Sequence, residues 1–441
     1  MVPPLRAGLL LLADDLTGAC DAGSMATATG RPVRCLLAGR PGWERTALQV
    51  WPGTTVVDLE TRRLGPRAAA RRAGAAARAL VRLGIGPAYF KVDSTLRGHP
   101  AREAEAIRRG AGRRLAWLVL ANPAQGRWTV GGRQFVHGRP VDRTAFAHDP
   151  LQPVRNADVL VLAAAAVGAS RVAHLTVHDL ARGPRHVARL RRRWLAHGVR
   201  MVVADALRES HLVALARCIP AADLACGAAA FARYLLPGRV PLPARVLPGK
   251  GSLTVTPTSQ RSSTPSRSPV PLGKRSHSGR VAGAGSQTVE GSPLRSADLH
   301  RTGPALVRGR VLAIIGSVNP VTAEQVRLAA RVRGVAVGRG VPRGGRWWII
   351  AWPRWPGTAR VARAAAAAFA RWRPVTVLCS GGETAAAVAE ALGIAVLTLE
   401  GELQPGLVTS RARTGDGATI GFVTKPGGFG AAQALARMAA A

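Results

Sequence analysis

The chain has 441 residues, 47% of them hydrophobic, which is enough for two or three domains that each bury a core. No uninterrupted apolar stretch of about 18 residues occurs, which predicts no membrane-spanning helix and no membrane partner. The formal net charge of +38 favours anionic ligands, but the basic residues are dispersed and not interleaved with aromatic residues, so no specific nucleic-acid partner is expected.

In chain order, the first apolar run covers residues 7–13. It is short, and Asp14 and Asp15 follow it in place of a small-residue cleavage site, so no export signal is expected. The five cysteines show no C-x-x-C pairing. An odd, scattered set of cysteines is typical of reduced thiols in a cytoplasmic protein, which is the expected location.

The first half of the chain alternates short apolar runs with segments of helical period. Buried strands are predicted for residues 9–12, 33–37, 55–59, 88–92, 115–121 and 159–164. Helices are predicted between strands for residues 16–29 and 67–83. Strand, helix and strand in that order predict βαβ units and a mainly parallel sheet. Residues 129–141 contain two glycine turns and are predicted to form a hairpin.

The middle of the chain lacks this alternation. Residues 249–302 are rich in Ser, Pro, Thr, Gly and Arg and contain very few large apolar side chains. Such a segment cannot bury enough surface to offset its conformational entropy. We therefore predict a disordered, Ser/Pro-rich linker over residues 238–307, between an N-terminal domain at 1–237 and a C-terminal domain at 308–441.

After the linker, the alternation of strand and helix resumes. Strands are predicted for residues 311–315, 347–351, 375–379, 395–399 and 418–423. Helices are predicted for residues 321–331, 358–371, 384–392 and 431–440. The predicted fold class is therefore α/β, with two three-layer domains whose sheets are mainly parallel.

Polar residues follow the first predicted strand. In open parallel sheets, ligands bind at the carboxyl ends of the strands. Asp14 and Asp15 stand at such an end and open a helix, where two carboxylates can accept a proton or help to hold a metal ion. The alternative is a helix N-cap, for which Asp is a preferred residue. Capping explains one aspartate but not two.

A second polar loop follows the fourth predicted strand. Within seven positions it contains Lys91, Asp93, Ser94, Thr95 and Arg97. This composition suits an anionic, hydroxylated ligand, because arginine pairs bidentately with a carboxylate and hydroxyl side chains bond to sugar hydroxyls. The alternative is the capped start of a helix with solvated charges. Lysine is rare in this chain, which favours the functional interpretation.

Three glycine turns in the second half each follow a strand and precede a helix. They cover residues 315–319, 380–384 and 425–430, and the last contains Lys425. Glycines at such turns let backbone N–H groups approach phosphate oxygens at the positive end of a helix. Three of them in one domain predict a nucleotide phosphate site. The P-loop pattern is absent, and no dinucleotide fingerprint follows the first strand of either domain.

Together these loops resemble those of the four-carbon acid sugar kinase family, which includes threonate, erythronate and 3-oxo-tetronate kinases. The matching stretches of the first half are residues 13–21 (ADDLTGACD), 91–98 (KVDSTLRG), 122–130 and 146–153 (FAHDPLQP). Those of the second half are residues 316–325 (GSVNPVTAEQ), 380–385 (SGGETA), 401–405 (GELQP) and 423–430 (VTKPGGFG). The resemblance implies an N-terminal domain that binds the sugar acid and a C-terminal domain that binds ATP.

The resemblance also implies roles for residues of both halves. Those implied to face the sugar acid are Asp14, Asp15, Arg62, Lys91, Asp93, Ser94 and Arg97. Those implied to hold the nucleotide are Ser317, Gly381, Gly382, Glu383, Thr384 and Gly427, to which the residue pattern adds Lys425.

We therefore expect an ATP-dependent kinase that phosphorylates the terminal hydroxyl of threonate, erythronate or 3-oxo-tetronate in carbohydrate catabolism. Asp15 or Asp14 would accept the hydroxyl proton, and Arg97, Lys91 and Arg62 would hold the carboxylate. Mg²⁺ would bridge the phosphates with few protein ligands, so no dedicated metal site is expected. The sequence is also compatible with a homodimer, a catalytically silent sensor of nucleotide and sugar acid, or a kinase of another small hydroxy acid.

Overall fold

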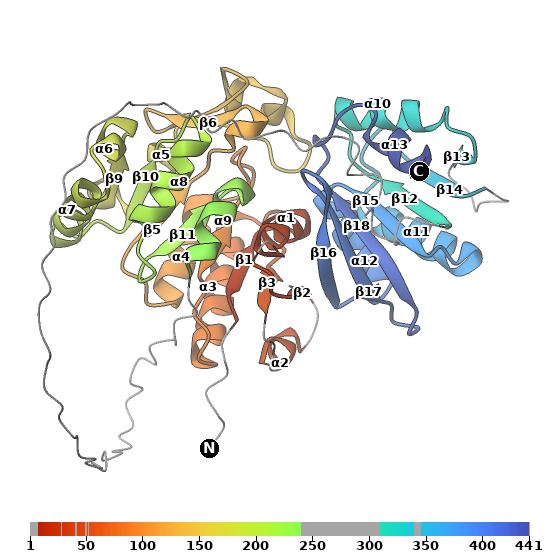
Figure 1. The fold of residues 1–441 in the computed structure, drawn as a ribbon, viewed down its shortest axis with the longest axis horizontal. Coiled ribbons are helices and arrows are strands. Elements are labelled where there is room, and N and C mark those ends of the chain that lie inside the picture. Colours follow the sequence, from red (N-terminus) through yellow and green to blue (C-terminus); the bar gives the residue numbers. More distant parts are fainter. Residues whose placement is uncertain are drawn as a thin grey trace, which may run out of the picture. The chain divides into compact units, whose positions relative to one another are not determined.

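The computed structural model describes residues 8–239 and 309–440, apart from 28, 40–41, 49–50, 52 and 339–344. The predicted linker lies outside the described residues from position 240 onward. Within the described part of the chain, the strands form one sheet of fifteen strands and a separate sheet of three (Figure 1). No helix in these ranges is long and apolar enough to cross a membrane.

The N-terminal section of the large sheet is entirely parallel. In spatial order its strands are β2 (Val33–Leu37), β3 (Thr54–Asp58), β1 (Leu10–Ala13), β4 (Tyr89–Lys91), β11 (Leu224–Gly227), β5 (Ala116–Val119), β10 (Met201–Ala204) and β9 (Val172–Leu175). Its helices are α1 (Leu16–Thr27), α2 (Trp43–Leu48), α3 (Pro66–Arg82), α4 (Pro100–Gly110), α5 (Val159–Val167), α6 (Val177–Ala181), α7 (Pro184–Ala196), α8 (Glu209–Cys218) and α9 (Ala229–Leu235).

The C-terminal section begins with five parallel strands and ends with two antiparallel ones. In spatial order they are β13 (Val335–Val337), β14 (Trp347–Ala351), β12 (Val311–Ile315), β15 (Thr376–Ser380), β18 (Thr419–Lys425), β17 (Leu407–Arg413) and β16 (Val396–Gln404). The helices are α10 (Pro320–Ala329), α11 (Thr358–Trp372), α12 (Gly382–Ala391) and α13 (Ala434–Ala440).

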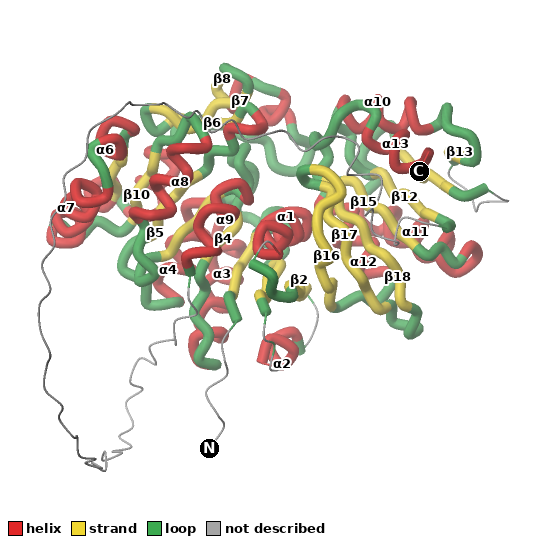
Figure 2. The backbone as a smooth tube through the Cα atoms, viewed as in Figure 1, coloured by secondary structure: helices red, strands yellow, loops and turns green. Residues whose placement is uncertain are grey.

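Helices cover both faces of the N-terminal section (Figure 2). Successive residues of a strand point to opposite faces of its sheet. Leu10 and Leu12 of β1 accordingly join a buried core with residues of α3, α4 and α5. Leu11 and Ala13 join the opposite core with residues of α1, α8 and α9.

The C-terminal section has the same three layers. Leu378 of β15 packs in a core with residues of α10 and α13. Its neighbours Val377 and Cys379 belong to the core on the other face, which includes residues of α11 and α12. The predicted α/β class, with mainly parallel sheets between helical layers, is confirmed.

The strands β2 and β16 join the two sections into one sheet. They pair antiparallel, with Val33 opposite Leu399 and Leu36 opposite Val396. The described residues of both halves accordingly belong to one compact unit. This pairing was not anticipated, because the pattern of strands and helices predicts a separate sheet for each half.

The apolar run at 159–164, predicted as a strand, instead forms most of α5. Asp158 caps this helix, because its carboxylate accepts a hydrogen bond at 3.0 Å from a backbone N–H of the first turn. The buried residues Val159, Ala163 and Val167 are four apart, which is a helical spacing. The prediction was wrong because a continuous apolar run does not by itself distinguish a strand from a helix.

Two further segments, one in each half, form antiparallel strands. The hairpin predicted at 129–141 is confirmed as β6 (Arg127–Val130), β7 (Arg133–Val136) and β8 (Arg139–Pro140). The strand β17 was not predicted. Its Thr409 and Ser410 are buried between β16 and β18, so it shows neither an apolar run nor a clean alternation.

Candidate active site

The loops after β1, β3 and β4 meet at one edge of the sheet, because these strands are parallel neighbours. Asp14 and Asp15 follow β1, Arg62 lies in the turn after β3, and Lys91 ends β4. Backbone bonds tie these loops together. The Arg62 N–H donates to the Asp14 carbonyl at 3.0 Å, and the Asp14 N–H donates to the Lys91 carbonyl at 3.3 Å. The loops that contain the residues expected to face the sugar acid therefore leave the sheet at the same edge.

Arg62 contacts both aspartates. Its Nε and Nη2 donate to the Asp14 carboxylate at 2.9 and 2.8 Å, and its Nη1 lies 2.6 Å from Oδ2 of Asp15. Burial raises the pKa of Asp14; the Arg62 guanidinium opposes this shift and the Asp15 carboxylate adds to it. Arg62 therefore fixes the pair, and both oxygens of Asp14 are already engaged.

Asp15 caps α1. Its Oδ1 accepts a hydrogen bond from the Gly18 N–H at 2.9 Å, and its Oδ2 accepts one from the Thr17 hydroxyl at 2.7 Å. The capping interpretation is thus correct for Asp15, whereas Asp14 is explained by its ion pair with Arg62. Asp15 is 7% exposed and Asp14 is 2% exposed, so Asp15 is the more accessible carboxylate.

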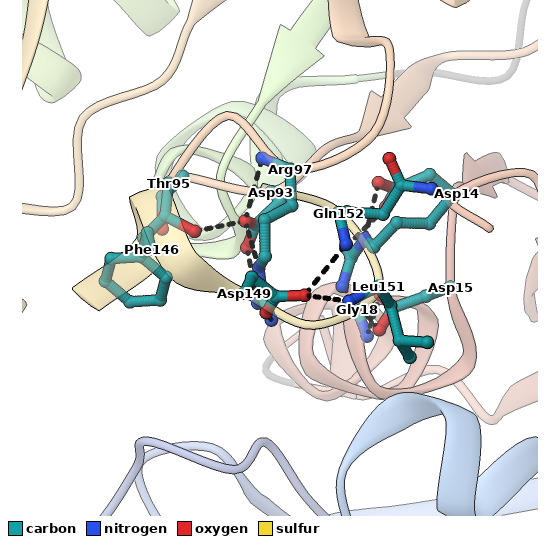
Figure 3. Close-up of polar contacts among 12 residues, drawn as sticks. Asp14, Asp15, Gly18, Asp93, Thr95, Arg97, Phe146, Asp149, Leu151 and Gln152 are labelled. Atoms are coloured by element: carbon teal, nitrogen blue, oxygen red, sulfur yellow. Dashed lines mark hydrogen bonds and ion pairs between the residues drawn. The ribbon is translucent and has the colours of Figure 1, made fainter. Parts of the chain in front are cut away.

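Asp93 organises the loop after β4 (Figure 3). It accepts hydrogen bonds from Nε and Nη2 of Arg97 at 2.9 and 3.2 Å and from the Thr95 hydroxyl. Nη1 of Arg97 also lies 3.4 Å from Asp149. Burial raises the pKa of Asp93, but the guanidinium groups of Arg97 and Arg62 outweigh burial and hold this pKa well below its usual range. Asp93 therefore stays ionised, and Arg97 already faces two carboxylates.

Ser94 is held by the β6–β7 hairpin. Its hydroxyl accepts a hydrogen bond from Nη1 of Arg127 at 2.7 Å, and its carbonyl accepts one from Nε2 of Gln134 at 2.7 Å. Arg127 also lies over the rings of Phe146 and Phe429, at 5.9 and 5.1 Å from their centroids. The Ser94 hydroxyl keeps its own proton free to donate to a ligand.

Lys91 lies next to Gly18 of α1. A Cβ at position 18 would lie 2.9 Å from Nζ of Lys91 and 2.5 Å from the Asp15 carboxylate, so glycine leaves room for both groups. Asp21, further along α1, is a buried carboxyl near the same lysine. Burial raises the pKa of Asp21 to about 7, and the Lys91 charge opposes this shift. The Lys91 ammonium therefore lies near two carboxyl groups, those of Asp15 and Asp21.

The three glycine loops meet at one edge of the C-terminal section, because β12, β15 and β18 are parallel neighbours. The Ser317 N–H donates to the Ser380 carbonyl at 3.2 Å, and the Gly381 N–H donates to the Lys425 carbonyl at 2.8 Å. Gly381 has a φ of +106°, which glycine adopts without strain. Backbone hydrogen bonds therefore connect all three loops at this edge.

Side chains of α10 fix the 425–430 loop. The Thr322 hydroxyl donates to the Gly427 carbonyl, and Nε2 of Gln325 donates to the Phe429 carbonyl at 3.0 Å. A Cβ at position 427 would collide with the Ser317 side chain, so only glycine allows this approach. Ser317 and Gly427, both expected to hold the nucleotide, are thus in direct contact.

Lys425 is fully buried and turned toward its own loop. Its Nζ donates to the carbonyls of Pro426 and Gly427, both at 3.1 Å, and lies 3.4 Å from Oγ of Ser380. Burial lowers the pKa of Lys425 to about 7. In this arrangement Lys425 stabilises the loop, and its three acceptors are protein atoms.

The two edges face each other where α12 begins. A Cβ at Gly382 would collide with the Asp15 carboxylate. Arg63 lies 3.8 Å from Glu383, whose pKa is raised by burial. Both halves line one small pocket, formed by Asp14, Asp15, Leu16, Asp58, Glu60, Arg62, Arg63, Gly382, Glu383 and Ala386. Residues expected to face the sugar acid and residues expected to hold the nucleotide thus share this pocket.

Thr384 lies two positions after Gly382, in the first turn of α12. It is almost completely buried, and its Oγ1 has no hydrogen-bond partner among the described residues. A Cβ at Gly316 would collide with that oxygen, so Thr384 packs directly against the loop after β12. Within the described ranges, no group of three or more His, Cys, Asp or Glu side chains is placed to hold a metal ion.

Asp21, Arg127 and Asp149 were not among the predicted site residues. All three lie in the stretches 13–21, 122–130 and 146–153, which carried the family resemblance, so the signal was present. Asp149 meets Arg97 across 52 positions of the chain, and no local pattern predicts such a contact.

Two protein-family models match the chain. The model described as a sugar-binding N-terminal domain matches residues 9–235. The model described as a nucleotide-binding C-terminal domain matches residues 356–435. Ser317 lies outside both matched ranges, whereas the other expected site residues lie within them.

Curated relatives match the chain at different lengths. A D-threonate kinase from Cupriavidus necator is 31% identical, and the match covers 97% of this chain and 96% of the relative. A 3-oxo-tetronate kinase from Burkholderia multivorans is 26% identical over 95% of this chain and 94% of its own. A D-threonate kinase from Salmonella typhimurium is 30% identical, but the chain spans only about half of it, 53%.

Solved structures share the fold. A Salmonella typhimurium protein superposes with a TM-score of 0.68 at 18% identity, covering 98% of both chains. A Haemophilus influenzae protein does so with a TM-score of 0.62 at 17% identity, over 98% of this chain and 99% of that one. At these identities the likeness concerns the fold alone.

Proposed function

This chain belongs to the four-carbon acid sugar kinase family, and we propose that it transfers the terminal phosphoryl group of ATP to the terminal hydroxyl of a four-carbon sugar acid. Relatives named D-threonate, D-erythronate and 3-oxo-tetronate kinase support a phosphotransferase of this family. Threonate, erythronate and 3-oxo-tetronate are accordingly the proposed acceptors, and ATP with Mg²⁺ is the proposed donor.

The contact between Asp15 and Gly382 carries this proposal. Asp15 opens α1 on the side expected to bind the sugar acid, and Gly382 opens α12 on the side expected to bind the nucleotide. The start of a helix favours a phosphate group. A carboxylate beside it can accept the proton of an attacking hydroxyl. A phosphate-favouring helix start beside a carboxylate supports direct phosphoryl transfer at this point.

Asp15 is the proposed general base. Both carboxylates are engaged, Asp14 by Arg62 and Asp15 by Arg62, Gly18 and Thr17, so exposure and position decide between them. Asp15 is more exposed and lies against the start of α12. A general base of this kind contributes roughly 10²–10⁴-fold to the rate.

In the proposed reaction, the acceptor hydroxyl oxygen bonds to the terminal phosphorus while the bond from this phosphorus to the bridging oxygen breaks. The bridging oxygen keeps the electron pair and leaves on ADP, and the hydroxyl proton passes to Asp15. Backbone N–H groups of the 380–384 turn orient the phosphates. Mg²⁺, held mainly by phosphate oxygens, would neutralise part of their charge.

The carboxylate of the sugar acid needs a cation. Arg62 faces Asp14 and Asp15, and Arg97 faces Asp93 and Asp149, so these arginines mainly position the site. Lys91 takes part in none of the ion pairs found among the described residues. We therefore assign the carboxylate to Lys91, with Arg97 as second contact, because the 3.4 Å contact of Arg97 with Asp149 is long enough to be exchanged.

The test is ADP release with D- and L-threonate, D-erythronate and their 3-oxo forms. At least one acid should stimulate ADP release from ATP, and Asp15→Asn should lower kcat about 10²–10⁴-fold. The matched control is Asp158→Asn, which changes another helix-capping aspartate away from the site. Its kcat should equal that of the wild type.

Two outcomes would contradict the proposal. If Asp14→Asn and Asp15→Asn both turn over normally, the base is wrongly assigned. If the protein binds ATP and a tetronate but releases no ADP with any acid of the panel, it is a sensor and not a kinase.

A further inference from the structure

Arg127 is a buried cation that the mechanism above does not use. It begins β6, is 8% exposed, and forms no ion pair with a carboxylate among the described residues. Its Nε is buried and has no hydrogen-bond acceptor among those residues. A buried charge without a partner is costly, so such groups are normally paired or bind a ligand.

The other arginines of the site differ in this respect. Arg62 and Arg97 each contact two carboxylates at 3.4 Å or less. The contacts of Arg127 are a neutral hydroxyl, on Ser94, and two aromatic rings. Nearby charges of Asp93 and Asp21 act on it only through space. Its guanidinium therefore retains the capacity to bind an oxyanion bidentately.

Arg127 also bridges the two halves of the site. Through Nη1 it holds Ser94, in the loop expected to face the sugar acid. Its guanidinium lies 5.1 Å from the ring centroid of Phe429, in the glycine loop expected to hold the nucleotide. An oxyanion bound by Arg127 would thus lie close to residues expected to face the sugar acid and to a loop expected to hold the nucleotide. In a direct transfer the phosphoryl group passes from the nucleotide side to the acceptor side, so it is the oxyanion that this position suits best.

We propose that Arg127 binds the phosphoryl group during its transfer and stabilises its charge; this rests on the proposed kinase function. The guanidinium donates hydrogen bonds to phosphoryl oxygens while the bond to the bridging oxygen breaks and the bond to the acceptor hydroxyl oxygen forms. The electron pair leaves on ADP and the hydroxyl proton goes to Asp15. Arg127 gains and loses no proton, because its role is electrostatic.

The first test compares Arg127→Met, which removes the charge, with Arg127→Lys, which keeps it. Arg127→Met should lower kcat by about 10²–10³-fold or more, with KM values for ATP and the acid within about threefold of the wild type. Arg127→Lys should recover part of kcat. Arg133→Met is the matched control, since Arg133 is exposed on the same hairpin, and it should behave as the wild type.

A second test separates chemistry from folding. Guanidinium ion added at millimolar concentration should restore part of the kcat of Arg127→Ala, because it fills the missing site. Restored activity supports the proposal even if the variant is less stable. No rescue by guanidinium and no recovery in Arg127→Lys would show that the residue is a structural clamp of Ser94.

Two other results would overturn the assignment. A KM for the acid raised tenfold or more with unchanged kcat would place the substrate carboxylate, not the phosphoryl group, on Arg127. Unchanged kcat and KM values in Arg127→Met would show that the cation binds no reacting group.

A third measurement does not depend on the acceptor. Inorganic phosphate together with ADP should raise the Tm of the wild type more than ADP alone, and this increment should disappear in Arg127→Met but not in Arg133→Met. Phosphate could raise the Tm of the wild type but not that of Arg127→Met while no tetronate stimulates ADP release. The kinase proposal then fails, and the anion site at Arg127 is supported. If the increment is equal in wild type and Arg127→Met, the anion site fails.

Discussion

At the scale of single residues, Asp21 carries a charge that folding disfavours. Burial raises its pKa from 3.8 to about 7; Lys91 and Arg127 oppose this shift, and Glu402 and Asp15 add to it. Between pH 3.8 and about 7 the folded state therefore binds more protons at Asp21 than the unfolded chain does. The contribution of Asp21 to stability is present at low pH and is lost as the pH rises through about 7.

We predict that Asp21→Asn raises the free energy of unfolding at pH 8, where the buried carboxylate is ionised, and that this gain falls toward zero at pH 5. Urea unfolding at the two pH values measures it. Asp416→Asn is the control, because the pKa of Asp416 is lowered to about 2 and its replacement should give no gain at pH 8. An equal gain for Asp21→Asn at both pH values would contradict the prediction.

Candidate site residues could be predicted from the sequence where polar side chains directly follow a predicted strand. Asp14 and Lys91 were singled out in this way, and the structure places both at one sheet edge. Which side chains contact one another could not be predicted, because the Asp14–Arg62 contact joins positions 48 apart and the Ser94–Arg127 contact joins positions 33 apart. Residue type and local spacing predict which loop is polar, but not which charges neutralise each other.

At the scale of elements, α5 depends on its cap. The Asp158 carboxylate accepts the Val161 N–H at 3.0 Å, which satisfies one of the free donors of the first turn. We predict that Asp158→Ala lowers the free energy of unfolding by about 1 kcal/mol, as loss of an N-cap typically does. Asp158→Asn retains an acceptor and should cost much less. Equal effects of the two changes in urea unfolding would contradict the capping role.

The start of α12 gives a second prediction for an element. Gly382→Ala would bring a methyl group against the Asp15 carboxylate and to 3.1 Å from Oγ1 of Thr17. The carboxylate must then move, so we predict a fall in kcat of at least about 10²-fold, because misplacement of a reacting group by about 1 Å has this effect. Steady-state kinetics measures it.

The control for that change is Gly65→Ala at the start of α3. Gly65 has a φ of −66°, and beyond its chain neighbours no atom lies within 4 Å of the place that an alanine methyl group would take. Alanine therefore fits there, and the kcat and Tm of this variant should match those of the wild type. Normal turnover in Gly382→Ala would show that the Asp15–Gly382 contact is irrelevant to catalysis.

Elements were predictable where one period dominates. The run at 311–315 is a strand with the predicted bounds, because it is apolar throughout and buried on both faces. The run at 159–164 was assigned to the wrong class, because alanine and valine in sequence fit either element. The strand β17 was missed, because its polar residues Thr409 and Ser410 are buried by neighbouring strands.

At the scale of the whole molecule, the sheet is continuous where the sequence predicts two separate ones. The pairing of β2 with β16 joins segments about 360 positions apart, and neither strand carries a local signal for its partner. Contacts such as those of Asp15 with Gly382 and Arg127 with Phe429 occur within the same compact unit. The site therefore arises from tertiary structure, while each of its loops arises from local sequence.

The most direct test of phosphoryl transfer is to detect the phosphorylated product. In a mixture of the protein, ATP, Mg²⁺ and the tetronate that stimulates ADP release, ³¹P NMR should show one phosphate ester of the acid for each ADP formed, and no ester with Asp15→Asn. This result is expected because the aspartates after β1 and the start of α12, in the 380–384 glycine turn, line one pocket. Formation of ADP and free phosphate without any ester, for every tetronate tested, would contradict direct transfer between the two halves.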